Sequence, residues 1–232
     1  MIRKLLRLLW LAAALAPVVA CPVKAAQRSA RAVFFKRPAG LAESAVLVHA
    51  GGGIPITLPA MNLSEPVGLP AGDLVLAVLP QAPAAGRPIP PDAPQVRIPG
   101  AWPQVLLLFF HDPTNKIFPV RVLPFDGSTG SFKPGEMLCL NLSTAVVGGT
   151  LGEAKFRISP GKTAVLKPSV REAGDYPVAV DCLLKGEASP RPLCRTSWRH
   201  DLETRQILFI INPDDRPVPR IWSVTESLHS KP

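Results

Sequence analysis

Short apolar runs separated by prolines and glycines restrict what this chain can fold into. The 232 residues include 28 prolines and 17 glycines, which interrupt the chain every few positions. No window places apolar residues at positions i, i+3, i+4 and i+7 over a length that would support a good amphipathic helix. Runs of about four to eight residues rich in Val, Leu, Ile and Phe therefore predict strands.

The expected strands recur at spacings of about 8 to 12 residues, which is typical of a β-sandwich or a barrel. They cover residues 31–36, 44–49, 54–58, 73–79, 95–98, 105–110, 119–123, 136–142, 149–151, 154–158, 163–166, 176–184, 195–198, 206–211 and 220–225. A parallel α/β sheet needs crossover helices, for which the chain has no room. The sequence thus predicts an all-β protein with one or two immunoglobulin-like antiparallel β-sandwiches.

Two tandem sandwiches are the preferred arrangement. A polar, Gly/Ser-rich break at residues 125–131 divides the chain into a first domain of residues 27–125 and a second of residues 126–228, each of a length typical of a sandwich. The order strand, turn, strand, Pro/Gly turn, strand occurs in both halves, beginning at Val46 and at Met137. The Pro-rich segment from Pro80 to Pro94 is expected to be an exposed loop, partly in polyproline II conformation.

The first 26 residues predict export. Arg3, Lys4 and Arg7 give the segment a basic start. The apolar run from residue 5 to residue 20 is too short to span a bilayer, and a small-residue end suits cleavage after Ala25 or Ala26. A competing reading is that residues 18–21 (Val-Val-Ala-Cys) resemble a bacterial lipobox whose Cys21 is acylated. The protein is therefore expected in the periplasm or outside the cell, and on a membrane only if Cys21 is lipidated.

The charge of the mature chain is mildly basic. The full chain has 26 Lys and Arg against 17 Asp and Glu, and removal of residues 1–26 takes four basic residues and no acidic one, so the net charge falls from +9 to 22 − 17 = +5. This excess suits a solvated basic surface or weak attraction to anionic envelope polymers. Nucleic acid is not an expected partner, since no stretch interleaves aromatic and basic residues.

The cysteines that remain after cleavage are Cys139, Cys182 and Cys194, an odd number for an oxidising compartment. Cys182 ends one expected strand and Cys194 opens the next, so we expect a disulfide across the base of a hairpin. Cys139 lies in an apolar run and is read as a buried free thiol, with pairing to Cys182 or Cys194 as the alternative.

The pattern contains no recognisable reaction centre. His49, His111, His200 and His229 are scattered singly without metal-ligand spacing. No G-x-S-x-G elbow or phosphate-binding loop occurs. The sequence therefore predicts no metal, no cofactor and no catalytic set.

One cluster, at residues 195–205, offers a possible ligand surface. If residues 195–198 form a hairpin with residues 206–211, alternation places Trp198 on one face and Arg195 and Arg199 on the other. The plainer reading is a core tryptophan beside a charged turn. The functional reading joins Arg195, Trp198, Arg199 and His200 in a surface that stacks on a sugar ring and binds its carboxylate or sulfate. Trp102 and Trp222 are further candidates, although either suits the core equally well.

The second half resembles a group of uncharacterised exported bacterial β-sandwich proteins. The similarity rests on residues 132–138, 141–143, 148–152, 158–161 and 198–201, and extends over residues 30–226. The turns of the first half are also similar to small periplasmic modules of polysaccharide-modification systems. The resemblance implies an envelope location and no catalysis. Our leading hypothesis is an exported interaction or scaffold module for envelope proteins or anionic polysaccharide. The alternative is a carbohydrate-active or ester-hydrolysing enzyme whose residues meet only in the fold.

Overall fold

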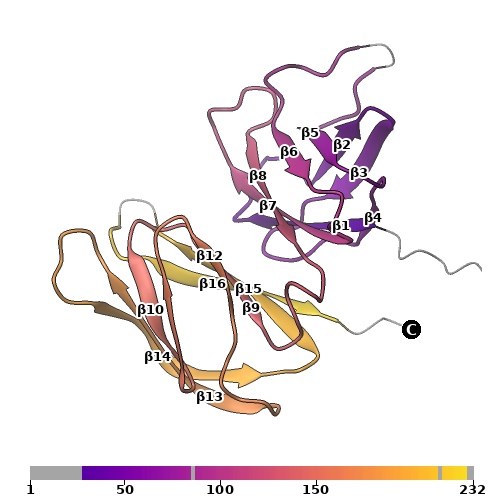
Figure 1. Ribbon diagram of the computed structural model, residues 1–232. Helices are drawn as coiled ribbons and strands as arrows, with labels where there is room; N and C mark the ends of the chain where they lie inside the picture. The colour runs from indigo at the N-terminus through magenta and orange to yellow at the C-terminus, as the bar shows by residue number, and fades with distance from the viewer. Residues whose placement is uncertain (1–27, 85–86, 214–215, 229–232) are drawn as a thin grey trace, which may run out of the picture.

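The computed structural model describes residues 28–84, 87–213 and 216–228 (Figure 1). Within these ranges the chain forms sixteen strands and no helix. The prediction of an all-β fold built from sandwiches is confirmed. The predicted signal peptide of residues 1–26, with Cys21, lies outside the described residues. In the described part of the chain, no helix is long and apolar enough to cross a membrane.

The first eight strands form one sandwich of two four-stranded sheets, ordered β4-β1-β7-β8 and β3-β2-β5-β6. Their bounds are β1 (Ser29–Phe35), β2 (Ser44–His49), β3 (Gly52–Thr57), β4 (Val67–Gly68), β5 (Leu74–Leu79), β6 (Gln95–Ile98), β7 (Gln104–His111) and β8 (Val120–Asp126). The Pro-rich segment between β5 and β6 is irregular and mostly exposed over its described residues. Its Ala93 is buried with Val48, Ala77 and Leu79 on the outer face of the second sheet.

The last eight strands form a second sandwich, with sheets ordered β12-β9-β15-β16 and β11-β10-β13-β14. Their bounds are β9 (Met137–Asn141), β10 (Val146–Leu151), β11 (Ala154–Ile158), β12 (Thr163–Leu166), β13 (Gly174–Leu183), β14 (Arg191–His200), β15 (Thr204–Ile211) and β16 (Arg220–Ser227). Every strand of the first sandwich thus has a counterpart eight strands later with the same neighbours. The repeat predicted from the sequence is shifted by one strand. It matches Val46 of β2 with Met137 of β9, whereas β2 corresponds to β10.

Each sandwich contains one parallel strand pair among antiparallel ones. β1 lies parallel to β7, with Ser29 opposite Gln104, and β9 lies parallel to β15, with Met137 opposite Gln206. The connection between the two strands of each pair runs through the opposite sheet, so the parallel pairing needs no crossover helix. The short strand β4, of two residues, was not predicted.

The strands of the two parallel pairs are buried on both faces. Adjacent residues of a strand point to opposite faces, so a continuous apolar run serves two cores. In β1 and β7, one set of side chains packs inside the first sandwich: Ala30, Ala32, Phe34, Val105, Leu107 and Phe109. The alternate set joins a separate cluster: Val33, Phe35, Leu106, Leu108 and Phe110. The apolar runs of these strands therefore reflect burial on both sides.

This separate cluster, which we call the inter-sandwich core, also contains residues from the second sandwich. β9 and β15 contribute Leu138, Leu140, Ile207 and Phe209. The ring of Phe209 lies 5.1 Å from that of Phe35 and 6.2 Å from that of Phe110, measured between centroids. The sheet that contains β1 and β7 consequently packs against the sheet that contains β9 and β15 (Figure 1).

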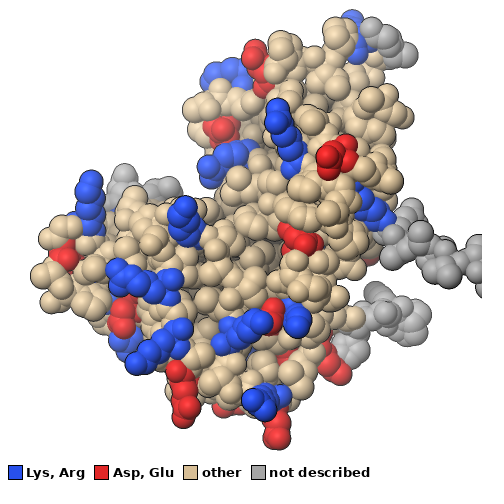
Figure 2. Space-filling view, viewed as in Figure 1, with Lys and Arg blue, Asp and Glu red and all other residues tan. Residues whose placement is uncertain are grey.

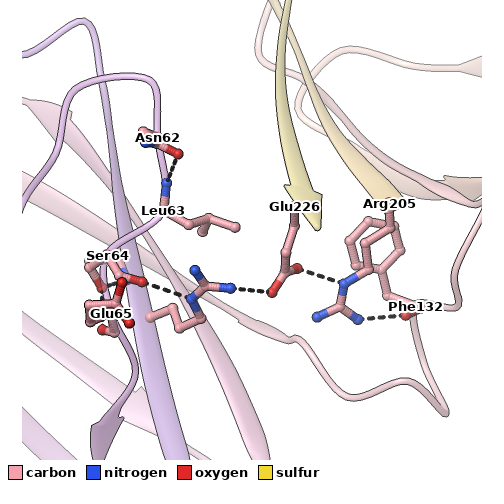
Figure 3. Close-up of polar contacts among 9 residues, drawn as sticks. Asn62, Leu63, Ser64, Glu65, Phe132, Arg205 and Glu226 are labelled. Atoms are coloured by element: carbon pink, nitrogen blue, oxygen red, sulfur yellow. Dashed lines mark hydrogen bonds and ion pairs between the residues drawn. The ribbon is translucent and has the colours of Figure 1, made fainter. Parts of the chain in front are cut away.

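A buried ionic group connects the same two sheets at the edge of the inter-sandwich core (Figure 3). The Glu226 carboxylate accepts a hydrogen bond from Arg205 Nε at 2.6 Å and another from Arg31 Nη1, on the first sandwich, at 2.7 Å. Arg205 also donates to the Phe132 carbonyl at 2.6 Å and lies over the Phe132 ring. The side chains of Arg205 and Glu226 are almost inaccessible, so each charge depends on the other for compensation.

The Gly/Ser-rich segment between the sandwiches is an ordered turn. Asp126 accepts hydrogen bonds from Ser128 N at 2.9 Å and Ser131 Oγ at 2.5 Å. The backbone N–H of Phe132 donates to the Ser128 carbonyl, and the Phe132 side chain is buried in the inter-sandwich core. This turn therefore connects β8 to β9 while contributing to the packing between the sandwiches.

The Glu226→Gln variant tests the ionic group. It removes the carboxylate charge and leaves the buried Arg205 guanidinium without a counter-charge, so we expect the free energy of unfolding to fall by about 3–5 kcal/mol. Urea denaturation followed by circular dichroism measures the change. Lys167→Ala, which removes an exposed partner of Glu136, is the control, with an expected change below about 1 kcal/mol. Equal effects of the two variants would contradict a stabilising role for the buried pair.

Candidate functional site

The residues of the predicted ligand surface all lie on β14, but the hairpin predicted for them is wrong. β14 pairs with β13, with Trp198 opposite Tyr176, while β15 enters the other sheet between β9 and β16. The burial of the two strands accounts for the difference. β15 is apolar on both faces and suits a central position, whereas β14 carries exposed polar side chains and forms the edge of its sheet.

The four predicted ligand residues separate into three environments. Trp198 is half-buried against the core of the second sandwich, and Arg199 is exposed beside it. Arg195 forms an ion pair with Asp181 at 2.5 Å on the outer face of the sheet. His200 is buried edge-on against Tyr176, with ring centroids 6.3 Å apart, and packs beside Gly135. Only Trp198 and Arg199 therefore contribute to the largest hollow of this region.

That hollow is a groove of about 640 Å³ between the two sheets of the second sandwich, on the side where β14 and β16 are the edge strands. We call it the β14–β16 groove. Its floor is apolar and consists of Leu193, Cys194, Leu208 and Ile221, with Trp198 and Trp222 alongside. Arg199 and Arg220, Ser197, Ser223 and Gln206 supply the polar lining. The groove thus combines an apolar interior with basic groups at its margin.

The charge of the groove has one sign. Its described lining residues include two arginines and no carboxylate. Asp175 is opposite Arg199 on β13, but no ion pair joins them, and Arg220 has no acidic partner among the residues described. Lys36 places its ammonium 4.3 Å from the centre of the Trp222 ring and adds a third cation nearby. On the face shown in Figure 2, basic and acidic side chains are interspersed.

The first sandwich differs on the equivalent side, although its topology is the same. β6 and β8, the counterparts of β14 and β16, lie in contact and close that side of the sandwich. β6 has four residues, whereas β14 has ten. The repeat therefore shows that the open side is a particular feature of the second sandwich and not a requirement of the topology.

The described histidines, His49, His111 and His200, lie at the ends of three different strands, β2, β7 and β14. The Nδ1 atom of His49 accepts a hydrogen bond from Gly51 N, and no hydrogen bond joins a described histidine to a serine or a carboxylate. His229 lies outside the described residues. Nor do three His, Cys, Asp or Glu side chains gather within the described ranges in a way that could hold a metal ion.

The three described cysteines are free thiols, so the structure does not contain the expected Cys182–Cys194 disulfide. Cys194 is opposite Val180, and Cys182 is opposite Arg191, because a bulge shifts the register of β13 and β14. Diagonal neighbours on a sheet are about 7–8 Å apart at Cα, which is beyond ordinary disulfide geometry. Burial raises the pKa of Cys139 to about 12 and also raises the pKa of Cys182. Cys194 is partly accessible and lines the groove.

Sequence reasoning missed the contribution of β16. Arg220, Ile221 and Trp222 lie far from residues 195–200 in the sequence and reach the groove only through the packing of the two sheets. Of the two further tryptophan candidates, Trp222 lines the groove, whereas Trp102 packs against the core of the first sandwich. The only signal in the sequence was an arginine and a tryptophan at the start of the strand expected at residues 220–225.

Comparison with known proteins gives no further guide to this site. No protein-family model matches the chain, and no curated protein resembles it in sequence. The resemblance to exported β-sandwich proteins therefore stays a prediction, and the function has to be argued from the groove.

Thiol labelling tests the environments of the cysteines. In the reduced, folded protein at pH 8, we expect N-ethylmaleimide to modify Cys194 first. Cys139 and Cys182 are expected to react only after unfolding, because a raised pKa keeps the thiol protonated and burial excludes the reagent. Peptide mass spectrometry after timed quenching gives the order. Modification of Cys139 before Cys194 would contradict the packing described here.

Proposed function

We propose that this protein is an exported, non-catalytic interaction module of the cell envelope that binds an anionic partner in the β14–β16 groove. The observation that carries the proposal is the composition of the groove. It has an apolar floor between the outer edges of β14 and β16 and arginines at its margin, and its described lining residues include no carboxylate.

Charge and burial act together in such a site. An apolar floor supplies affinity through the area removed from water, while Arg199 and Arg220 select the sign of the partner and speed the encounter. Both arginines are exposed, so their attraction to an anion weakens as salt is added. Binding should therefore combine a salt-sensitive part with a salt-resistant apolar part.

An interaction role accounts for the groove better than catalysis does. Cys194, Ser197 and Ser223 are the potential nucleophiles of the groove, and its described lining includes no histidine or carboxylate that could activate them. The predicted signal peptide supports an envelope location, where proteins and acidic polysaccharides are the available anionic partners. A scaffold or binding role is consistent with both features.

A titration with three polyanions tests the proposal. Polyglutamate, polygalacturonate and heparin are added separately to the exported protein, and the tryptophan fluorescence, to which Trp198 and Trp222 contribute, is followed. We expect at least one polyanion to give a saturable change that weakens between 50 and 300 mM salt. The double variant Arg199→Glu, Arg220→Glu should weaken this binding by about tenfold or more.

Arg97→Glu is the matched control. Arg97 is an exposed arginine on β6, the counterpart of β14 in the closed sandwich, and its reversal changes the net charge without altering the groove. The control changes the net charge less than the double variant does, and it should leave the affinity within about twofold. Absence of binding to all three polyanions, or equal loss in the control, would overturn the proposed function.

A further inference from the structure

We infer that the partner is an extended acidic segment of polypeptide, which adds as a strand to the free edge of β14 and places alternate apolar side chains in the β14–β16 groove. This inference rests on the proposed function and names the chemistry of its ligand. It is argued from the unpaired backbone of β14, from the position of the unpartnered arginines and from the state of the two tryptophan rings.

The edge of β14 is long and uncovered. Nine of its ten residues pair with β13 on one side, Leu193 being bulged out of register, and no backbone hydrogen bond from the described residues reaches the other side. A long unpaired edge is a template for strand addition, which proteins ordinarily shorten or cover. The first sandwich follows this rule, since its counterpart β6 is short and contacts β8. The second sandwich leaves the edge open beside an apolar hollow.

The side-chain pattern required of such a strand follows from the groove. Alternate residues of a strand point to opposite faces, so one set of side chains would enter the floor formed by Leu193, Leu208 and Ile221. The other set would face outward, beside the exposed arginines. Arg191 and Arg195 already pair with Glu187 and Asp181. Acidic residues are therefore expected opposite the end of β14 that carries Arg199.

The tryptophans favour a peptide over a polysaccharide. Sugar rings stack on aromatic faces that are free, but Trp198 packs against the core of the sandwich. The ring of Trp222 is covered by the Lys36 ammonium at 4.3 Å, and Phe35 meets it edge-on. The groove consequently offers unpaired backbone groups and an apolar floor, whereas the Trp222 ring is covered by Lys36 and Trp198 is half-buried.

The experiment uses an acetylated, fluorescently labelled peptide of about eight residues in which valine and glutamate alternate. The backbone amides of successive residues in a strand point to opposite edges. When every valine side chain faces the apolar floor, the amides of one residue type point at β14 and those of the other type point away from it. Two further peptides carry N-methyl groups on all valines or on all glutamates. We expect one N-methylated peptide to lose affinity by about tenfold or more and the other to bind within a few fold of the parent, since strand addition uses one edge only.

The exported protein, the double variant Arg199→Glu, Arg220→Glu and the control Arg97→Glu are titrated with each peptide and with tetragalacturonate. The double variant should bind the parent peptide about tenfold more weakly, and the control should not. Equal binding of both N-methylated peptides, or tighter binding of tetragalacturonate than of the parent peptide, overturns strand addition but leaves the proposed function standing. Absence of binding to any peptide, to tetragalacturonate and to the three polyanions overturns both.

Discussion

The structure depends on two pairs of parallel strands that are buried on both faces. β1 with β7 and β9 with β15 each form the wall of one sandwich core and, through alternate side chains, one side of the inter-sandwich core. The contact of Phe209 with Phe35 and Phe110 joins the two halves. Deletion of such a ring in a packed core typically costs about 3–5 kcal/mol, so the arrangement of the sandwiches is set mainly by apolar packing.

The charges at the edge of this core have a different role. Two arginines share one glutamate, and Arg205 and Glu226 have little access to water. Buried ion pairs add little stability relative to apolar groups, but leaving one charge unpaired is costly. Arrangements that separate Arg31 and Arg205 from Glu226 are therefore disfavoured, and the ionic group selects one way of placing the sandwiches together.

The internal repeat shows how one topology supports two outcomes. Both sandwiches have the same strand order, yet β6 and β8 meet in the first, while β14 and β16 border a groove in the second. The greater length of β14 and the lack of a β14–β16 contact like that between β6 and β8 distinguish the two. This difference between a closed and an open copy is the physical basis of the function proposed here.

Apolar runs and Pro/Gly punctuation determined the strands, because both act within a few residues; β2, β6, β11 and β12 have their predicted bounds. Local pattern also identified Trp198 and Arg199 as notable. The pairing of β14 with β13, the free state of Cys182 and Cys194, and the contribution of Arg220 and Trp222 depend on contacts between strands distant in sequence. Tertiary structure alone decided these features. Whether a strand lies at an edge depends on how the apolar faces of all the strands are buried together, and this cannot be read from a few neighbouring residues.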